Sequence, residues 1–227
     1  MAALQRHGLV WLDEAGWQAV LQPDAGDPPW DEEALDCLRH WARRDLPLVV
    51  TRQPLHAPAD AVTLGLAAPL RWGRRRLFVG TRLQHLRRHG AFPQAATLSA
   101  ALAPALHPRW HALCAALSAQ GVDARVHGSF GWQLLCGEPC VRAGSDIDLL
   151  LPCRSAAQAD AVAALLGQPG WGATRLDGEL LWPDDGAVAW REWAAWRAGR
   201  QRQLLVKRLR GAALESGAAW ADAALPA

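Results

Sequence analysis

The sequence contains no tyrosine, and Lys207 is the only lysine among 24 basic residues, so arginine supplies nearly all of the positive charge. The same chain has 13 tryptophans. This bias is typical of a GC-rich genome, and the counts alone therefore identify no function. The net charge is also small, at +2, which does not require a nucleic-acid or membrane partner.

Cysteine pairs and long apolar segments are missing as well. The five cysteines are an odd number and include no C-x-x-C motif, which argues against a disulfide framework and against a zinc site. Residues 1–17 lack the continuous apolar segment of a signal peptide, and no stretch approaches the roughly eighteen apolar residues of a membrane helix. We therefore expect free thiols, a cytoplasmic location and no membrane partner.

The remaining composition is that of a globular chain. With 51% hydrophobic and 20% charged residues, 227 residues are enough for one or two domains with a buried core. Residues 1–90 contain four short strand-like segments and a helical segment starting at Asp31, which predicts a small α+β domain. Residues 91–227 alternate between helical and strand patterns, which predicts a second domain of α/β (α+β) class.

The second domain is expected to contain a defined series of elements. The Asp185-Gly186 dipeptide predicts a type I′ hairpin turn between its last two strands. Helices are expected at 110–119, 130–136, 155–166 and from about 201, and strands at 123–126, 146–151, 173–182 and 187–193.

The segment "RVHGSFGW" predicts a strand that ends at a Gly-Ser pair and leads into a helix. The first N–H groups of a helix have no partner within the helix, and they favour an anion such as phosphate. Gly128 would let a phosphate approach the backbone, and Ser129 would add a hydroxyl group. The alternative is that Ser129 only caps the helix, which is a common role of serine at such a place.

The segment "SDIDLLL" places Asp146 and Asp148 at alternate positions of an apolar strand, so both carboxylates point to the same face. Two adjacent anions repel and raise each other's pKa unless a cation neutralises them. Mg²⁺, or Mn²⁺ in its place, can bind a polyphosphate on such a pair and stabilise the attacking and leaving oxygens. The alternative is a solvated strand end without a metal.

A third carboxylate is expected from the strands that follow. Asp177 and Glu179 share a face by alternation, and counting back from the predicted turn places Glu179 opposite Glu192. Like charges directly opposite are unfavourable in a sheet unless a cation or a function holds them. We expect Glu179 or Asp177, with Glu179 preferred because Asp177-Gly178 is itself a turn sequence; the alternative is that all three are solvated.

Three basic residues are candidates for binding phosphate groups of a substrate. Lys207 lies in the apolar segment "LLVKRL", where a compact ammonium group suits a triphosphate; the alternative is that this single lysine is accidental. Arg52 in "VVTRQ" and Arg142 in "CVRAGSD" are the other two, and for both the alternative is an exposed surface arginine.

A Gly-Ser turn followed by an Asp-x-Asp strand resembles the signature of the nucleotidyltransferase superfamily, in which a later strand supplies a third carboxylate. Sixteen residues lie between Ser129 and Asp146, more than in many members, and a helix plus the extra turn "GEPCVRAG" would accommodate them. The segments "LPLVVTRQ", "VTLGLAAP", "RRRLFV", "RVHGSFGWQLLCGEP", "SDIDLLL", "RLDGEL" and "VAWREW", in that order, resemble one family within it: the malonate decarboxylase holo-acyl-carrier-protein synthases, also called phosphoribosyl-dephospho-CoA transferases. The resemblance spans about residues 6–210.

This resemblance implies a nucleotidyltransferase-like mixed sheet and a specific reaction. The family joins 2′-(5″-triphosphoribosyl)-3′-dephospho-CoA to a serine of the apo acyl carrier protein of malonate decarboxylase and releases diphosphate. It implies that Asp146 and Asp148 hold Mg²⁺, that Gly128 and Ser129 bind the triphosphate, and that no nucleic acid is involved. The basic segment 71–76, at a predicted hairpin turn, is then either a solvated tip or a landing surface for an acidic carrier protein.

Two other functions fit the same residues. A nucleotidyltransferase that uses ATP on a small molecule or on another protein would share the site without binding a CoA arm. A non-catalytic module that binds a carrier protein or RNA would share the fold, although the presence of both Asp146 and Asp148 argues against lost chemistry.

Overall fold

The computed structural model describes residues 4–23 and 28–216, which fall into two compact units. The first unit consists of Met1–Phe92, Trp132–Val141 and Leu209–Gly211. The second consists of Pro93–Gly131, Arg142–Arg208 and Ala212–Ala227. Both units combine helices with a β-sheet, which confirms the expected α+β class.

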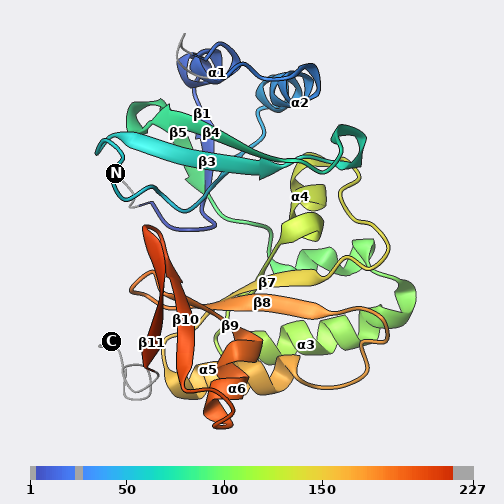
Figure 1. Ribbon diagram of the computed structural model, residues 1–227. Helices are drawn as coiled ribbons and strands as arrows, with labels where there is room; N and C mark the ends of the chain where they lie inside the picture. The colour runs from blue at the N-terminus through green and yellow to red at the C-terminus, as the bar shows by residue number, and fades with distance from the viewer. Residues whose placement is uncertain (1–3, 24–27, 217–227) are drawn as a thin grey trace. The chain divides into compact units, whose positions relative to one another are not determined.

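The first unit is built on a five-stranded antiparallel sheet with the strand order β4-β3-β2-β1-β5 (Figure 1). One face of this sheet is apolar, because alternate side chains of β3 and β4 are buried, among them Leu64 and Val79. Helix α2 starts after Asp31, as expected, because the Asp31 carboxylate accepts a hydrogen bond from the N–H of Ala34. The elements of the first unit are β1 (Leu9–Leu12), α1 (Glu14–Leu21), α2 (Glu32–Arg43), β2 (Leu48–Val50), β3 (Ala61–Ala67), β4 (Arg76–Arg82) and β5 (Leu86–Gly90), with short 3₁₀ helices at Leu70–Trp72 and Leu83–His85.

The second unit contains a six-stranded sheet with the order β11-β10-β9-β8-β7-β6. Strands β7 and β8 are parallel, and the crossover between them carries helix α5. The strands are β6 (Arg125–His127), β7 (Ile147–Pro152), β8 (Leu176–Leu181), β9 (Ala187–Ala189), β10 (Gln203–Arg208) and β11 (Gly211–Ser216). The helices are α3 (His107–Ala119), α4 (Gly128–Cys136), α5 (Ala156–Leu166) and α6 (Trp190–Arg197), with 3₁₀ helices at Ala95–Ala101 and Pro104–Leu106. Helix α4 begins in the second unit, and its later residues belong to the first.

The two faces of the second sheet differ in character. Ile147, Leu149 and Leu151 of β7 point to one face and are fully buried, whereas Asp148 and the buried Leu150 point to the other face. Helices α3, α5 and α6 cover this apolar face (Figure 1). Burying a leucine or isoleucine side chain contributes roughly 1.5–3 kcal/mol, so this layer holds the sheet in one register. The opposite face carries the charged side chains of β7 and β8.

Two expected elements of the C-terminal part are wrong. The strand predicted at 187–193 ends at Ala189, and helix α6 begins at Trp190, so Glu192 lies on a helix and Ala189 is the residue opposite Glu179. The helix predicted from about 201 is instead a pair of strands, β10 and β11. The buried residues Leu204 and Val206 of β10 are two positions apart, which is the period of a strand.

The expected hairpin between β8 and β9 is present, but its turn is of another type. The N–H of Trp182 donates to the carbonyl oxygen of Gly186, so three residues form the loop. A type I′ turn needs positive φ at both central residues, and here Asp185 has φ +67° whereas Gly186 is not in the left-handed region. Pro183 at the start of the loop accounts for this, because proline fixes a negative φ.

No helix in residues 4–23 and 28–216 is both long enough and apolar enough to span a membrane.

Candidate active site

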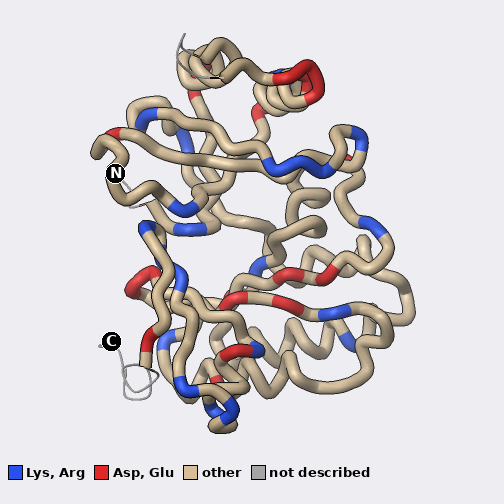
Figure 2. Tube along the Cα trace, viewed as in Figure 1, with Lys and Arg blue, Asp and Glu red and all other residues tan. Residues whose placement is uncertain are grey.

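Four carboxylates come together on neighbouring strands of the second unit. Asp148 on β7 lies directly beside Asp177 on β8 in the parallel register. Asp146 directly precedes β7 and, two residues before Asp148, faces the same side of the sheet. Glu179 follows Asp177 on that same face of β8. Figure 2 shows the resulting acidic segments side by side on β7 and β8.

The acidic cluster strongly perturbs Asp148. Burial and, after it, the negative charges of Asp177, Asp146 and Glu179 raise the pKa of Asp148 to about 6. Each of these effects disfavours the ionised carboxylate. A strongly perturbed carboxylate among other carboxylates is typical of a functional site, because such repulsion is retained where a cation or a reaction uses it.

Gly128 brings the start of α4 against this carboxylate. His127, the last residue of β6, pairs with Asp148, and α4 begins at the next residue. Gly128 has φ +61°, and a Cβ atom added to it would overlap Oδ2 of Asp148 and lie 2.8 Å from Cγ. Only glycine therefore fits between β6 and α4 with the Asp148 side chain in this place. Ser129, the second residue of α4, lies in the first helical turn.

Lys207 and Glu179 form an ion pair. The Nζ atom of Lys207 on β10 donates to Oε1 of Glu179 at 2.7 Å, and the glutamate side chain is only 13% exposed. The positive charge of Lys207 compensates Glu179, whereas Asp177 lies beside Asp148 in the register. These contacts favour Asp177 over Glu179 as the carboxylate that acts together with Asp148, which is the reverse of the order expected from the sequence.

Glu192 is not part of the cluster. It lies on α6, where its Oε1 atom accepts a hydrogen bond of 2.7 Å from the N–H of Leu205 on β10. Its backbone carbonyl accepts a second hydrogen bond, from the side chain of Gln201. Glu192 therefore holds α6 to the strand that follows it, and this structural role removes it from the candidates for a third carboxylate.

The two arginines proposed from the sequence belong to different units. Arg142 is an exposed residue of the second unit, in the turn that leads to Asp146, where its backbone N–H and carbonyl group both bond to Ser145. Arg52 is an exposed residue of the first unit, directly after β2. Arg142 therefore lies in the same unit as the acidic cluster, whereas Arg52 does not.

Arg175 also belongs to the candidate site, although it is not among the residues expected from the sequence. Its Nε atom lies 3.6 Å from Oδ1 of Asp146, and its backbone carbonyl accepts a hydrogen bond from the N–H of Ile147. The signal in the sequence is the alternation of Arg175, Asp177 and Glu179, which places all three on one face of a strand.

The acidic cluster offers a suitable but partial set of metal ligands. Within residues 4–23 and 28–216, no group of three or more His, Cys, Asp and Glu side chains is gathered so that it could hold a metal ion by itself. Mg²⁺ does not need such a group, because it usually keeps several waters and binds one or two carboxylates together with substrate phosphates. The hard oxygen atoms of Asp146 and Asp148 fit this mode of binding.

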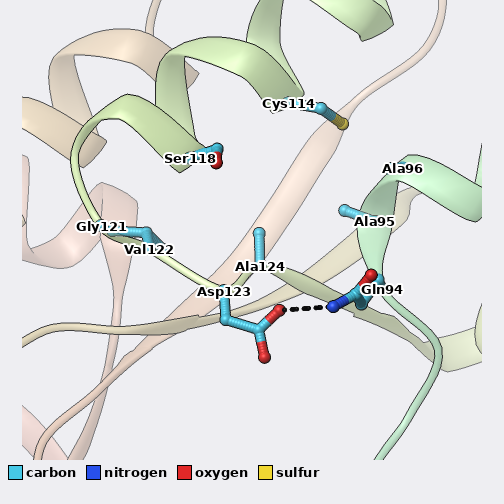
Figure 3. Close-up of a pocket in the computed structure, with 9 residues that line it drawn as sticks. All are labelled: Gln94, Ala95, Ala96, Cys114, Ser118, Gly121, Val122, Asp123 and Ala124. Atoms are coloured by element: carbon cyan, nitrogen blue, oxygen red, sulfur yellow. Dashed lines mark hydrogen bonds between the residues drawn. The ribbon is translucent and has the colours of Figure 1, made fainter.

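A separate pocket in the second unit lies away from this cluster. It has a volume of about 330 Å³ and lies between the end of α3 and the segment before β6 (Figure 3). The side chain of Gln94 donates to Asp123 at its rim. Its lining consists mainly of small side chains and includes none of the acidic residues of β7 and β8. The pocket therefore does not extend the candidate active site.

Comparisons with known proteins identify a family for the whole chain. Residues 93–218 match the sequence model of the phosphoribosyl-dephospho-CoA transferase MdcG C-terminal domain, and residues 5–92 match that of the MdcG N-terminal domain. The phosphoribosyl-dephospho-CoA transferase of Xanthomonas euvesicatoria pv. vesicatoria (strain 85-10) is 37% identical over 206 residues, which cover 89% of each chain. That of Xanthomonas axonopodis pv. citri (strain 306) is 38% identical over 209 residues, again 89% of each chain.

A relative from another genus gives the same result. The phosphoribosyl-dephospho-CoA transferase of Bradyrhizobium diazoefficiens is 36% identical over 204 residues, which cover 89% of this chain and 85% of the relative. No solved structure matches the chain. Because both domain models and relatives over most of the length agree, the chain belongs to the phosphoribosyl-dephospho-CoA transferase (MdcG) family and is a transferase.

Proposed function

We propose that the protein transfers 2′-(5″-triphosphoribosyl)-3′-dephospho-CoA to a serine of the apo acyl carrier protein of malonate decarboxylase. The product is a phosphodiester-linked prosthetic group, and diphosphate is released. The observation that carries this proposal is the position of the Asp148 carboxylate, which lies between Asp177 and the glycine that starts α4. The Gly-Ser turn that we propose to bind phosphate is thus adjacent to a carboxylate pair, which is the arrangement that phosphoryl transfer needs.

The start of α4 is the proposed phosphate-binding element. Its first N–H groups lie at the positive end of the helix dipole, and Gly128 leaves the backbone open to close approach. The hydroxyl group of Ser129 lies in the same helical turn. These groups would bind the triphosphate oxygens and orient the phosphorus atom that reacts.

Asp146 and Asp148 would hold Mg²⁺ or Mn²⁺, in agreement with the electrostatic strain on Asp148. When bound, the metal ion would neutralise phosphate charge and polarise the phosphorus–oxygen bonds. Arg175, beside Asp146, would add positive charge where diphosphate departs. Lys207 would contribute its charge from the same face, next to Glu179.

The carrier serine is the proposed nucleophile. Its hydroxyl oxygen forms a bond to the phosphorus atom proximal to the ribose, and the bond from that phosphorus to the bridging oxygen of diphosphate breaks. Asp177, in register with Asp148, is placed to accept the hydroxyl proton, and no serine of this chain has to form a covalent intermediate.

The five free cysteines support a reducing compartment, in keeping with the cytoplasmic location expected from the sequence.

The intact mass of the carrier protein tests the proposal. Apo carrier protein is incubated with the enzyme, Mg²⁺ and the triphosphoribosyl substrate, and the expected product is the carrier plus one phosphoribosyl-dephospho-CoA group, with equal release of diphosphate. A carrier variant in which the acceptor serine is alanine is the control. Transfer of AMP from ATP to the carrier or to another acceptor, without use of the CoA substrate, would instead indicate a different nucleotidyltransferase. Release of no diphosphate with any substrate would favour a binding module.

A further inference from the structure

Two cysteines at the end of α4 form a close pair. Cys136 is the last residue of α4, and Cys140 follows after three residues, in the connection toward β7. Their Sγ atoms are 3.8 Å apart, and the two residues are only 3% and 4% exposed. A disulfide bond is about 2.05 Å long, so the sulfur atoms would need to approach by roughly 1.8 Å.

The backbone around the pair keeps the two thiols together. Both Sγ atoms face the carbonyl oxygen of Glu138, at 3.9 Å from Cys136 and 3.4 Å from Cys140. Gln133, one helical turn earlier, accepts hydrogen bonds from the N–H groups of Cys140 and Val141 at 3.0 and 3.1 Å. Because these bonds close the turn over Gly137, which has φ +71°, the two sulfur atoms meet without any partner from elsewhere in the fold.

The pair also differs electronically from the other cysteines. The hydrogen bond between the two thiols lowers the pKa of Cys136 to about 7, although burial opposes this shift. The same hydrogen bond and burial raise the pKa of Cys140. Burial raises the pKa of Cys37 to about 12, of Cys114 to about 11 and of Cys153 to about 12. The thiolate is the reactive form, so the lowered pKa favours Cys136 as the thiol that reacts first.

We propose that Cys136 and Cys140 are a redox-active dithiol, which a peroxide converts to a disulfide and a thiol reductant restores. The Cys136 thiolate attacks one oxygen of hydrogen peroxide, the O–O bond breaks, and hydroxide leaves to give a sulfenic acid. The sulfur of Cys140 then attacks the sulfur of Cys136, and the hydroxyl group departs as water with the Cys140 proton. Two thiols and one peroxide thus give one disulfide and two waters.

The position of the pair in the chain gives the disulfide a structural consequence. Helix α4 begins at Gly128 and ends at Cys136, and the connection that contains Cys140 leads to Asp146. A bond between the two sulfurs would therefore constrain residues 136–140, which lie within the segment that joins the Gly-Ser turn to the acidic strand. Oxidation of the two thiols does not depend on the transfer reaction, so it can be tested independently of the proposed function.

The test uses the reduced wild-type protein freed of reductant and treated with hydrogen peroxide. The free thiols should fall from five to three, and the protein mass should fall by two hydrogens, about 2 Da. The loss should map to the tryptic peptide of residues 126–142, which contains both cysteines, and dithiothreitol should restore it. Oxidation confined to Cys114, or a bond joining Cys37 to Cys136, would overturn the proposal, as would retention of all five thiols.

Variants assign the two roles. In Cys140→Ser, peroxide should leave a sulfenic acid on Cys136 that dimedone traps, because the second thiol is missing. In Cys136→Ser, neither a disulfide nor a trapped Cys140 should form. Cys114→Ser is the matched control, since Cys114 is more exposed than either member of the pair, and it should oxidise like the wild type. Equal trapping at Cys136 and Cys140 in the two single variants would contradict the assignment of Cys136 as the attacking thiol.

Discussion

Replacing Gly128 by alanine should displace the Asp148 carboxylate from the start of α4. The added Cβ atom would overlap Oδ2 of Asp148 and lie 2.8 Å from its Cγ and 3.1 Å from its Cβ. Rotation of the carboxylate alone cannot relieve contacts with Cγ and Cβ, since ordinary carbon contacts are about 3.5–4.0 Å. The side chain or the β6–α4 junction therefore has to move by about half an ångström or more.

The magnitude follows from two separate costs. Alanine at φ +61° costs about 1–2 kcal/mol of backbone strain, and forcing a side chain into occupied space costs roughly 1–3 kcal/mol more. Gly137, at the other end of α4, is a matched control, because it has φ +71° and no atom within 4 Å of an added Cβ. Gly137→Ala should therefore lower the free energy of unfolding by about 1–2 kcal/mol, and Gly128→Ala by about 2–5 kcal/mol.

Urea unfolding and kcat/KM separate the two variants. A shift of 1 Å in a catalytic group can cost about 100-fold in rate, so Gly128→Ala should lose at least that factor while Gly137→Ala keeps most of its activity. Equal losses of stability and activity in the two variants would show that only backbone strain matters and would refute the close contact between Gly128 and Asp148.

Further predictions concern single charges. In metal-free buffer, Asp148→Asn should raise the free energy of unfolding at pH 7 by up to about 3 kcal/mol, because the pKa of Asp148 is raised from 3.8 to about 6 and the ionised group destabilises the fold above that pKa. Thermal melts should show that this gain in stability shrinks toward pH 4. An unchanged melting temperature at pH 7 would contradict the prediction. In a double-mutant cycle, Lys207→Gln and Glu179→Gln should show a coupling energy of about 1 kcal/mol, since their ion pair is partly exposed. A coupling energy of zero would show that the ion pair does not stabilise the fold. Charge reversal of exposed Arg76 should lower kcat/KM for the carrier protein and weaken the dependence of kcat/KM on salt, while the affinity for the triphosphoribosyl substrate stays unchanged. An unchanged kcat/KM would mean that the arginine is only solvated.

The basic segment 71–76 is less available as a landing surface than its sequence indicates. Arg75 pairs with Asp31 at 2.6 Å, and Arg71 pairs with Glu138 at 3.0 Å while lying over the ring of Trp72. Asp31 caps the start of α2 and Glu138 lies two residues after α4, so the neutralisation is tertiary and no local pattern predicts it. Arg76 is therefore the more informative arginine of the segment to reverse.

Local patterns were sufficient for the parts of the site that lie within one strand or one turn. The shared face of Asp146 and Asp148 follows from the period of a strand, and the Gly-Ser turn follows from a strand that runs into a helix. These features depend only on neighbours in the sequence. The α+β class could be predicted for the same reason, since it rests on the alternation of short helical and strand patterns.

The parts that local patterns left open or predicted wrongly depend on pairing between distant segments. The choice between Asp177 and Glu179 requires the register of β7 with β8 and the arrival of Lys207 from β10. Glu192 was placed on a strand because the apolar residues around it suit either structure, and packing of Trp190 and Trp193 decides for the helix. The strands β10 and β11 were predicted as a helix, since a short apolar segment with two basic residues does not distinguish the two periods.

Loading of the carrier protein by variants of the acidic strand tests the central claim most directly. Asp146→Asn and Asp148→Asn each remove a charge that would contribute several kcal/mol at the transition state but little packing, and Asp123→Asn in the same unit is the control. In the intact-mass assay with Mg²⁺, the account predicts full loading by wild type and Asp123→Asn, no detectable loading by either strand variant, and none by wild type in EDTA. Loading by both strand variants at more than about a tenth of the wild-type rate, a barrier change of only about 1.4 kcal/mol, or full loading in EDTA, would contradict it.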